Sequence, residues 1–232
     1  MKRFYKNAVV IEFEGGYGIE LDGRRTQTPR KSTFTVEARK VADAVAAEWA
    51  DQRDEIVVEN MPMLRLANTA IDMIAPQRGA VVDNLAGYGS TDLLCYRADS
   101  PAELVRRQNE LWSPWLAWAR DQHDAELKTT NGIGYIAQND DALAALHAVV
   151  NRHDIMELAC LNDLVTIAGS LVLGLAVSGG ALDVTMAWEA IRLENHFQAG
   201  KWGEDAEAAA RAARLFEEFK HAALFLTLHR TN

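Results

Sequence analysis

The spacing of the apolar residues changes once along this chain, and that change most constrains the fold. From Ala8 to Val36 short apolar runs alternate with Gly and Asp, which permit the positive φ of tight hairpin turns. This pattern predicts a β-meander with strands over residues 9–13 and 17–21 and a further arm towards Pro29. The expected turns are Glu14-Gly15-Gly16 and Asp22-Gly23.

After residue 36 the apolar residues recur every three or four positions up to Trp49, which predicts a helix. An isolated meander cannot hide its apolar face, so we expect this helix to cover the sheet. Residues 55–58 are expected to return as a strand. Helices are then expected from Pro62 to Ala75 and, after Pro76, to Leu85.

The rest of the chain reads as helices, apart from an extended run expected over Thr91–Tyr96. The helices expected there are one with three tryptophans after Pro101, then 140–152, 154–177, 183–198 and 203–229. We therefore predict an α+β fold. A small β-rich N-terminal domain with a covering helix, residues 1–88, precedes a larger all-α helical bundle domain, residues 89–232.

The most apolar segment, residues 164–177, is too short to span a bilayer, which needs about 20 residues, so no membrane insertion is expected. We interpret it as a buried helix. Its small residues, including Gly169 and Gly174, indicate close helix packing or plasticity.

The charge of the chain argues against nucleic acid as a partner. The net charge is −9, and the sequence has no cluster of Lys and Arg to neutralise phosphates. Residues 1–70 carry 11 basic and 11 acidic side chains, whereas residues 71–232 carry 13 and 22. The acidic second part could attract a basic partner, or it could simply be solvated helix faces.

Common catalytic motifs are absent from the sequence. It has no phosphate-binding Gly-Lys-Ser/Thr, no dinucleotide-binding glycine triplet and no Gly-x-Ser-x-Gly. Cys95 and Cys160 are too few for a zinc cluster, and Glu218 with His221 forms only half of a di-iron pattern. We expect no catalytic residue, cofactor, metal or small-molecule substrate. A hydrolase using convergent carboxylates such as Asp92 or Asp163 stays open.

The most informative segment runs from Trp188 to Asp205. Glu194 and Gln198 are four residues apart and face the same way on a helix. Gly200 is expected to end that helix, and Trp202 to lie in the turn before Glu204 and Asp205 begin the next one. One interpretation is a bundle corner with Trp202 buried and Glu194 in solvent. The other is a partner-binding site formed by Glu194, Gln198 and Trp202.

A series of short segments, in order along nearly the whole chain, resembles the ATP-synthase assembly factor twelve family, in a bacterial form. They are Arg3-Phe4-Tyr5-Lys6, Leu21-Asp22-Gly23-Arg24 with Thr28-Pro29, Glu48-Trp49 with Gln52, Met61-Pro62, Thr91-Asp92-Leu93-Leu94-Cys95-Tyr96-Arg97, Gln108 with Trp112, Thr166 to Ser170-Leu171, and Glu194, Gln198 and Trp202-Gly203. The resemblance implies a β-rich N-terminal domain and a helical C-terminal domain.

The resemblance also implies a function. Such proteins are molecular chaperones that bind the free α subunit of the F-type ATP synthase head and prevent its aggregation before it assembles with β. The family's important glutamate falls at Glu194. Asn195 and His196 depart from the acidic character expected there. A generic interaction module with another client is the remaining alternative. No presequence is readable, so a bacterial cytoplasmic location is expected.

Overall fold

The computed structural model of the protein describes residues 1–13, 15–132, 134–203 and 205–231. The chain divides into two compact units. The first contains the described residues of 1–78, 154–160 and 221–232, and the second contains those of 79–153 and 161–220. Two helices, α6 (Ile155–Ala168) and α9 (Ala206–Arg230), contribute residues to both units.

The first unit begins with the predicted meander. Strands β1 (Ala8–Phe13), β2 (Gly16–Leu21) and β3 (Arg24–Arg25) form an antiparallel sheet in the order β1-β2-β3. Asp22 and Gly23 have φ of 49° and 79°, so the predicted turn residues adopt the left-handed conformation that this hairpin requires. The other expected turn includes Glu14, which lies outside the described residues.

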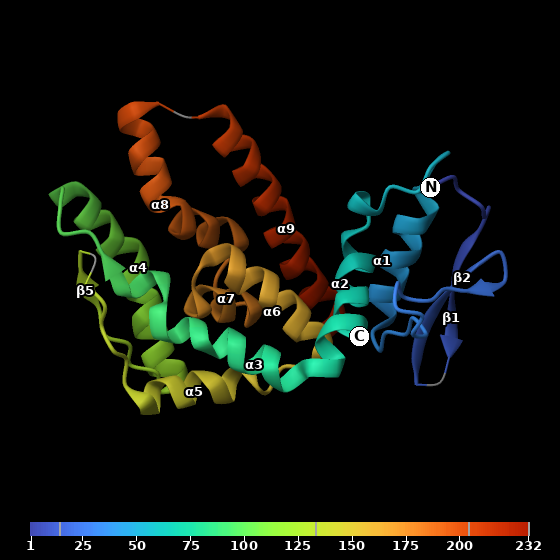
Figure 1. Ribbon diagram of the computed structural model, residues 1–232, viewed down its shortest axis with the longest axis horizontal. Helices are drawn as coiled ribbons and strands as arrows, with labels where there is room; N and C mark the ends of the chain where they lie inside the picture. The colour runs from blue at the N-terminus through green and yellow to red at the C-terminus, as the bar shows by residue number, and fades with distance from the viewer. Residues whose placement is uncertain (14, 133, 204, 232) are drawn as a thin grey trace. The chain divides into compact units, whose positions relative to one another are not determined.

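Helix α1 (Arg39–Ala50) covers the sheet as expected (Figure 1). Val41, Ala42 and Val45 are fully buried on its inner face. The expected strand over residues 55–58 is wrong, because only Glu55 makes a β-bridge, to Lys2, and a 3-10 turn, η1 (Val58–Asn60), follows. The chain then continues through α2 (Pro62–Thr69), a π-turn η2 (Ala70–Ile74) and a 3-10 turn η3 (Ala75–Gln77).

Side chains from distant positions tie the elements of this unit together. The Glu48 carboxylate of α1 accepts hydrogen bonds from the backbone N–H groups of Met63 (2.7 Å) and Leu64 (2.8 Å), and so caps α2. The hydroxyl of Tyr5 donates to the carbonyl of Trp49 at 2.7 Å. Tyr5, Glu48 and Trp49 all lie in the family segments quoted above.

The second unit is mainly helical. It contains most of α3 (Arg78–Gly87), and α4 (Ala102–His123), α5 (Asp140–Val150), α7 (Leu171–Ser178) and α8 (Val184–Trp202), with two short parallel strands, β4 (Tyr96–Arg97) and β5 (Thr130–Asn131). The expected extended run over Thr91–Tyr96 is wrong. The chain there forms two 3-10 turns, η4 (Tyr88–Thr91) and η5 (Leu93–Cys95), before β4 begins.

The buried Asp92 carboxylate explains these turns. It accepts hydrogen bonds from the N–H of Leu94 (3.0 Å), the N–H of Val172 (3.0 Å) and the hydroxyl of Ser170 (2.8 Å). Asp92 therefore caps η5 and also holds the start of α7. A short-range sequence pattern cannot reveal partners so far along the chain.

The segment 154–177 was expected to be one helix, and it is two. Gly169 has φ of 64° and separates α6 from α7, and the Ser170 hydroxyl caps α7 by accepting from Leu173 N at 3.1 Å. The expectation of close packing holds at Gly174, where an added Cβ would lie 2.6 Å from Cγ2 of Val165. The described helices include none that is long and apolar enough to cross a bilayer.

The predicted α+β class is confirmed, since the structure is 64% helical with a small sheet in the N-terminal part. The predicted domain boundary between residues 88 and 89 stays a prediction, because compactness in one structure does not show which segments fold on their own.

Candidate partner-binding site on helix α8

Helix α8 starts at a well-formed cap. The Asp183 carboxylate accepts hydrogen bonds from the N–H groups of Thr185 (2.8 Å) and Met186 (3.3 Å). Ala187, Ala190 and Leu193 form the buried stripe of the helix. Met186 precedes this stripe and is 58% exposed.

Glu194 follows the buried stripe and is half-buried. Its carboxylate accepts a 2.7 Å hydrogen bond from Nε2 of Gln108, which lies on α4. The interpretation that places Glu194 in solvent is therefore wrong on this point. Glu194 is not a free solvated side chain, because a buried amide fixes its direction.

Gln108 is itself fully buried and takes part in further hydrogen bonds. Its Oε1 accepts from the N–H of Ala98 at 2.8 Å, and its backbone carbonyl accepts from Nη1 of Arg97 at 2.8 Å. The Nε of Arg97 donates to the carbonyl of Leu94 at 2.7 Å. Gln108 thus has little freedom to move, and it positions Glu194 rigidly.

Trp112 completes this network one helical turn after Gln108. Its indole Nε1 donates to the carbonyl of Ala190 at 2.9 Å, which links α4 to α8 a second time. The Arg97 guanidinium lies 5.2 Å from the centre of the Trp112 ring. Burial lowers the pKa of Arg97 from its ordinary value, and the neighbouring Cys95 opposes this effect.

Gln198 and Trp202 continue the face of α8 that carries Glu194, at spacings of four and eight residues. Both are exposed, and Trp202 is 79% exposed. The interpretation of Trp202 as a buried plug is therefore wrong. Among the described residues, no hydrogen bond joins Gln198 or Trp202 to Glu194, so the three share a helix face and do not form a hydrogen-bonded cluster.

The end of α8 differs from the expectation. The helix continues through Gly200 to Trp202, and Gly203, with φ of 89°, ends it. Glu204 lies outside the described residues. Asp205 accepts from the N–H of Ala208 at 2.7 Å, as expected for an acidic residue at the start of α9.

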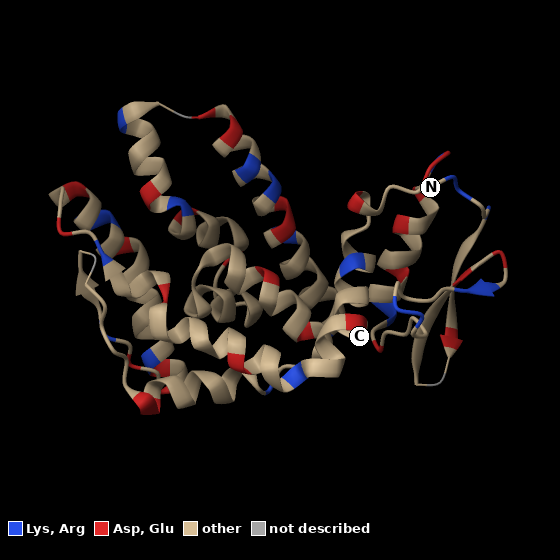
Figure 2. Ribbon diagram, in the orientation of Figure 1, with Lys and Arg blue, Asp and Glu red and all other residues tan. Residues whose placement is uncertain are grey.

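The surface around this face carries charges of both signs. The ammonium of Lys201 lies 4.4 Å from the centre of the Phe197 ring, and the guanidinium of Arg107 lies 5.8 Å from it. Figure 2 shows basic and acidic residues interspersed along α8 and α9. A partner of this surface would therefore meet a mixed polar and aromatic face.

Sequence reasoning did not connect Glu194 with the residues that support it. Arg97, Gln108 and Trp112 all lie in quoted family segments, but no local pattern joins them to α8. One signal was present in the sequence: Gln108 and Trp112 are four residues apart and share one face of a helix. A polar residue on the same face as a buried tryptophan indicates a buried hydrogen-bonding group.

The structure does not favour the hydrolase alternative. Asp92 is fully buried, its carboxylate is occupied by structural hydrogen bonds, and burial raises its pKa. Asp163 is half-buried on α6. Among residues 1–13, 15–132, 134–203 and 205–231, no group of three or more His, Cys, Asp or Glu could hold a metal.

Both cysteines are buried. Cys95 and Cys160 form no disulfide with each other. Burial, aided by Asp92, raises the pKa of Cys95 to about 12, so that this thiol stays protonated.

Comparison with known proteins gives a consistent result. The model of the family described as ATP12 chaperone protein matches residues 2–120. The chain is 26% identical over 219 residues to the mitochondrial protein atp12 of Schizosaccharomyces pombe, covering 88% of this chain and 75% of that one.

Solved structures agree over nearly the full length. The crystal structure of Atp12 from Paracoccus denitrificans superimposes with a TM-score of 0.96 at 40% identity, covering 99% of this chain and 98% of that one. A point mutant of the same protein gives the same values. The Atu1473 protein of Agrobacterium tumefaciens gives a TM-score of 0.94 at 36% identity, covering 97% and 85%.

These likenesses define the class of protein: it is an assembly chaperone and not an enzyme. The chain belongs to the ATP12 chaperone protein family, the assembly factors of the ATP synthase. The predicted family is therefore confirmed.

Proposed function

We propose that this chaperone binds the free α subunit of the ATP synthase head and prevents its aggregation until the β subunit takes its place. The face of α8 that carries Glu194, Gln198 and Trp202 is the proposed contact surface. A bacterial cytoplasmic location is part of the proposal, and its support is the likeness to the Paracoccus protein over 99% of the chain.

The observation that supports this site best is the exposure of Trp202 beside an oriented glutamate. A tryptophan that is 79% exposed has no role in the core, and tryptophan is enriched among the residues that dominate binding energy. Glu194 is held by Gln108, so its carboxylate loses little freedom when a partner binds. A standard interface of about 1,600 Å² would suit a reversible complex.

The test is suppression of α-subunit aggregation by the purified chaperone and by two single variants. Trp202→Ala is expected to weaken the complex by about 2 kcal/mol, or roughly 30-fold, as for an interface hot spot. Tyr135→Ala is the matched control, because Tyr135 is another exposed aromatic residue, at 71%, and lies outside the proposed face. Equal protection by Trp202→Ala and the parent protein would refute the site.

Glu194 is tested separately by charge reversal. Glu194→Lys is expected to fold and to lose protection, because a cation replaces the oriented carboxylate. Co-purification from the native cell tests the client itself. Recovery of another protein in place of the α subunit would favour a generic interaction module.

A further inference from the structure

The first unit contains a small, partly enclosed cavity of about 250 Å³, here called the Asp154 cavity. Four polar residues line it, Thr35, Glu37, Asp154 and His229, together with an apolar wall of Ile71, Ile155 and Met156. Pockets for drug-sized ligands are usually about 300–1,000 Å³, so this cavity suits one side chain or a small amine.

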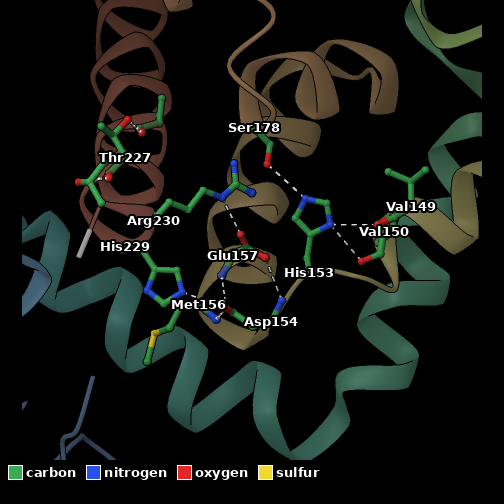
Figure 3. Close-up of polar contacts among 12 residues, drawn as sticks. Val149, Val150, His153, Asp154, Met156, Glu157, Ser178, Thr227, His229 and Arg230 are labelled. Atoms are coloured by element: carbon green, nitrogen blue, oxygen red, sulfur yellow. Dashed lines mark hydrogen bonds and ion pairs between the residues drawn. The ribbon is translucent and has the colours of Figure 1, made fainter. Parts of the chain in front are cut away.

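His229 is fixed at this cavity by an ion pair. Its Nε2 lies 2.7 Å from Oδ2 of Asp154, and the other oxygen of Asp154 caps α6 by accepting from Met156 N (2.8 Å) and Glu157 N (2.9 Å). Figure 3 shows His229 and Arg230 of α9 reaching Asp154 and Glu157 at the start of α6. Both ends of the His229–Asp154 pair are therefore anchored.

The second ring nitrogen of His229 is unsatisfied. Its Nδ1 is buried and has no hydrogen-bond partner. The side chain as a whole is only 9% exposed, so water does not readily reach this atom. When the neutral ring donates its Nε2 proton to Asp154, Nδ1 presents a lone pair. A buried polar atom without a partner is rare in native proteins and needs an explanation, such as a missing ligand donor.

The carboxylates near His229 favour its charged form. They belong to Asp154 just before α6, Glu157 on α6 and Glu37 just before α1. The Nε of Arg230 is 2.6 Å from Oε1 of Glu157, so an internal cation already offsets that carboxylate. The cavity itself is left with the carboxylates of Glu37 and Asp154 and an apolar wall.

The matching ligand is a cation that only donates hydrogen bonds and that carries an alkyl stem. We propose that the Asp154 cavity recognises the ammonium or guanidinium group of a lysine or arginine side chain presented by a protein partner. The stem lies along Ile71, Ile155 and Met156, and the charged head meets Glu37 and Asp154. This is a second recognition site, separate from the face of α8 that carries Trp202.

The proposal carries a pH dependence. The hydrogen bond to Asp154 raises the pKa of His229 above its ordinary value. Below that pKa the ring is an imidazolium whose Nδ1 is a donor, and it repels a cation. Affinity for the basic side chain is therefore expected to rise as the pH rises through the pKa of His229.

The experiment is an NMR titration of the full chain, labelled with nitrogen-15, with Nα-acetyl-lysine methylamide. The uncharged Nα-acetyl-norleucine methylamide is the matched control compound, and butylammonium chloride represents a free amine. Saturable shifts are expected at the amides of Gly15, Thr35, Met156 and His229 with the lysine compound and not with the norleucine compound.

Two variants sharpen the result. Glu37 is exposed, so Glu37→Gln is expected to keep the fold and to weaken binding roughly tenfold, the loss of one charge-assisted hydrogen bond. Asp83→Asn, which removes an exposed carboxylate that pairs with His147 elsewhere, is expected to bind like the parent.

Three outcomes would overturn the proposal. They are equal shifts with the norleucine compound, no saturable shift with the lysine compound, and parental affinity in Glu37→Gln. Butylammonium binding as tightly as the lysine compound would assign the cavity to a free amine instead of a protein side chain.

Discussion

The amide of Gln108 donates a 2.7 Å hydrogen bond to the carboxylate of Glu194, and this bond joins α4 to α8. Gln108 also accepts a hydrogen bond from the N–H of Ala98. One buried side chain therefore pairs with both the Glu194 carboxylate and the backbone of Ala98. The position of Glu194 on the surface therefore depends on the interior of the second unit.

Gln108→Leu should destabilise the protein by about 2 kcal/mol or more, because Ala98 N and Glu194 both lose a partner and buried unpaired groups cost about 1–3 kcal/mol each. Glu194→Gln keeps an acceptor oxygen and should change stability by less than about 1 kcal/mol. Urea unfolding of the two variants measures the difference. Equal destabilisation would contradict the role given to Gln108.

Asp92 should act on stability and not on catalysis. Asp92→Ala leaves Leu94 N, Val172 N and the Ser170 hydroxyl without their acceptor, so a loss of about 3 kcal/mol or more is expected. Ser170→Ala removes one of these groups and the α7 cap, and should cost about 1–2 kcal/mol. Thermal or urea unfolding measures the stability loss of each variant. A smaller loss in Asp92→Ala than in Ser170→Ala would contradict the role given to Asp92.

Gly174 should not tolerate a methyl group. The added Cβ of Gly174→Ala would lie 2.6 Å from Val165, so overpacking is expected to cost about 1–3 kcal/mol. Gly87→Ala is the matched control, because nothing lies within 4 Å of its added Cβ and its φ of −55° is helical. That control should be neutral or stabilised by about 0.4–1 kcal/mol. The prediction fails if both variants unfold at the same urea concentration.

Glu48 should make stability depend on pH. Burial outweighs its two backbone hydrogen bonds and raises its pKa from 4.5 to about 7. Between these values the folded protein keeps a proton that the unfolded chain has released, so this group lowers the free energy of unfolding as the pH rises from 4.5 to about 7.

The comparison is between the parent and Glu48→Gln, which does not titrate. Urea unfolding at several pH values should show the parent losing stability relative to the variant as the pH rises through this window. A difference that stays constant, or that grows in the parent's favour, would contradict the role of Glu48.

Local signals made part of the fold predictable. Asp22-Gly23 marks a hairpin by its own conformational freedom, and the spacing of Val41, Ala42 and Val45 marks the buried face of α1. These features depend on residues that are near one another in sequence. Periodicity and turn chemistry were therefore sufficient to predict the hairpin and the helix.

Other features depend on distant partners or on the backbone of one residue. The turns around Asp92 exist because Ser170 and Val172 meet its carboxylate. Gly200 is helical, whereas Gly203 adopts φ of 89° and ends the helix. Both residues are glycines, so residue type alone could not tell where α8 ends. For the candidate site, sequence predicted the shared face of Glu194 and Gln198 but not the amide of Gln108 that orients the carboxylate.

The first unit is assembled from the beginning, the middle and the end of the chain. Phe225 and Leu226 of α9 are buried in this unit. The ribosome adds them on the order of ten seconds after residue 78, where the first segment of the unit ends. During that interval the early residues of this unit lack their last buried neighbours. A member of this chaperone family therefore passes through an incomplete state of its own, which ends only when the last turns of α9 have been synthesised.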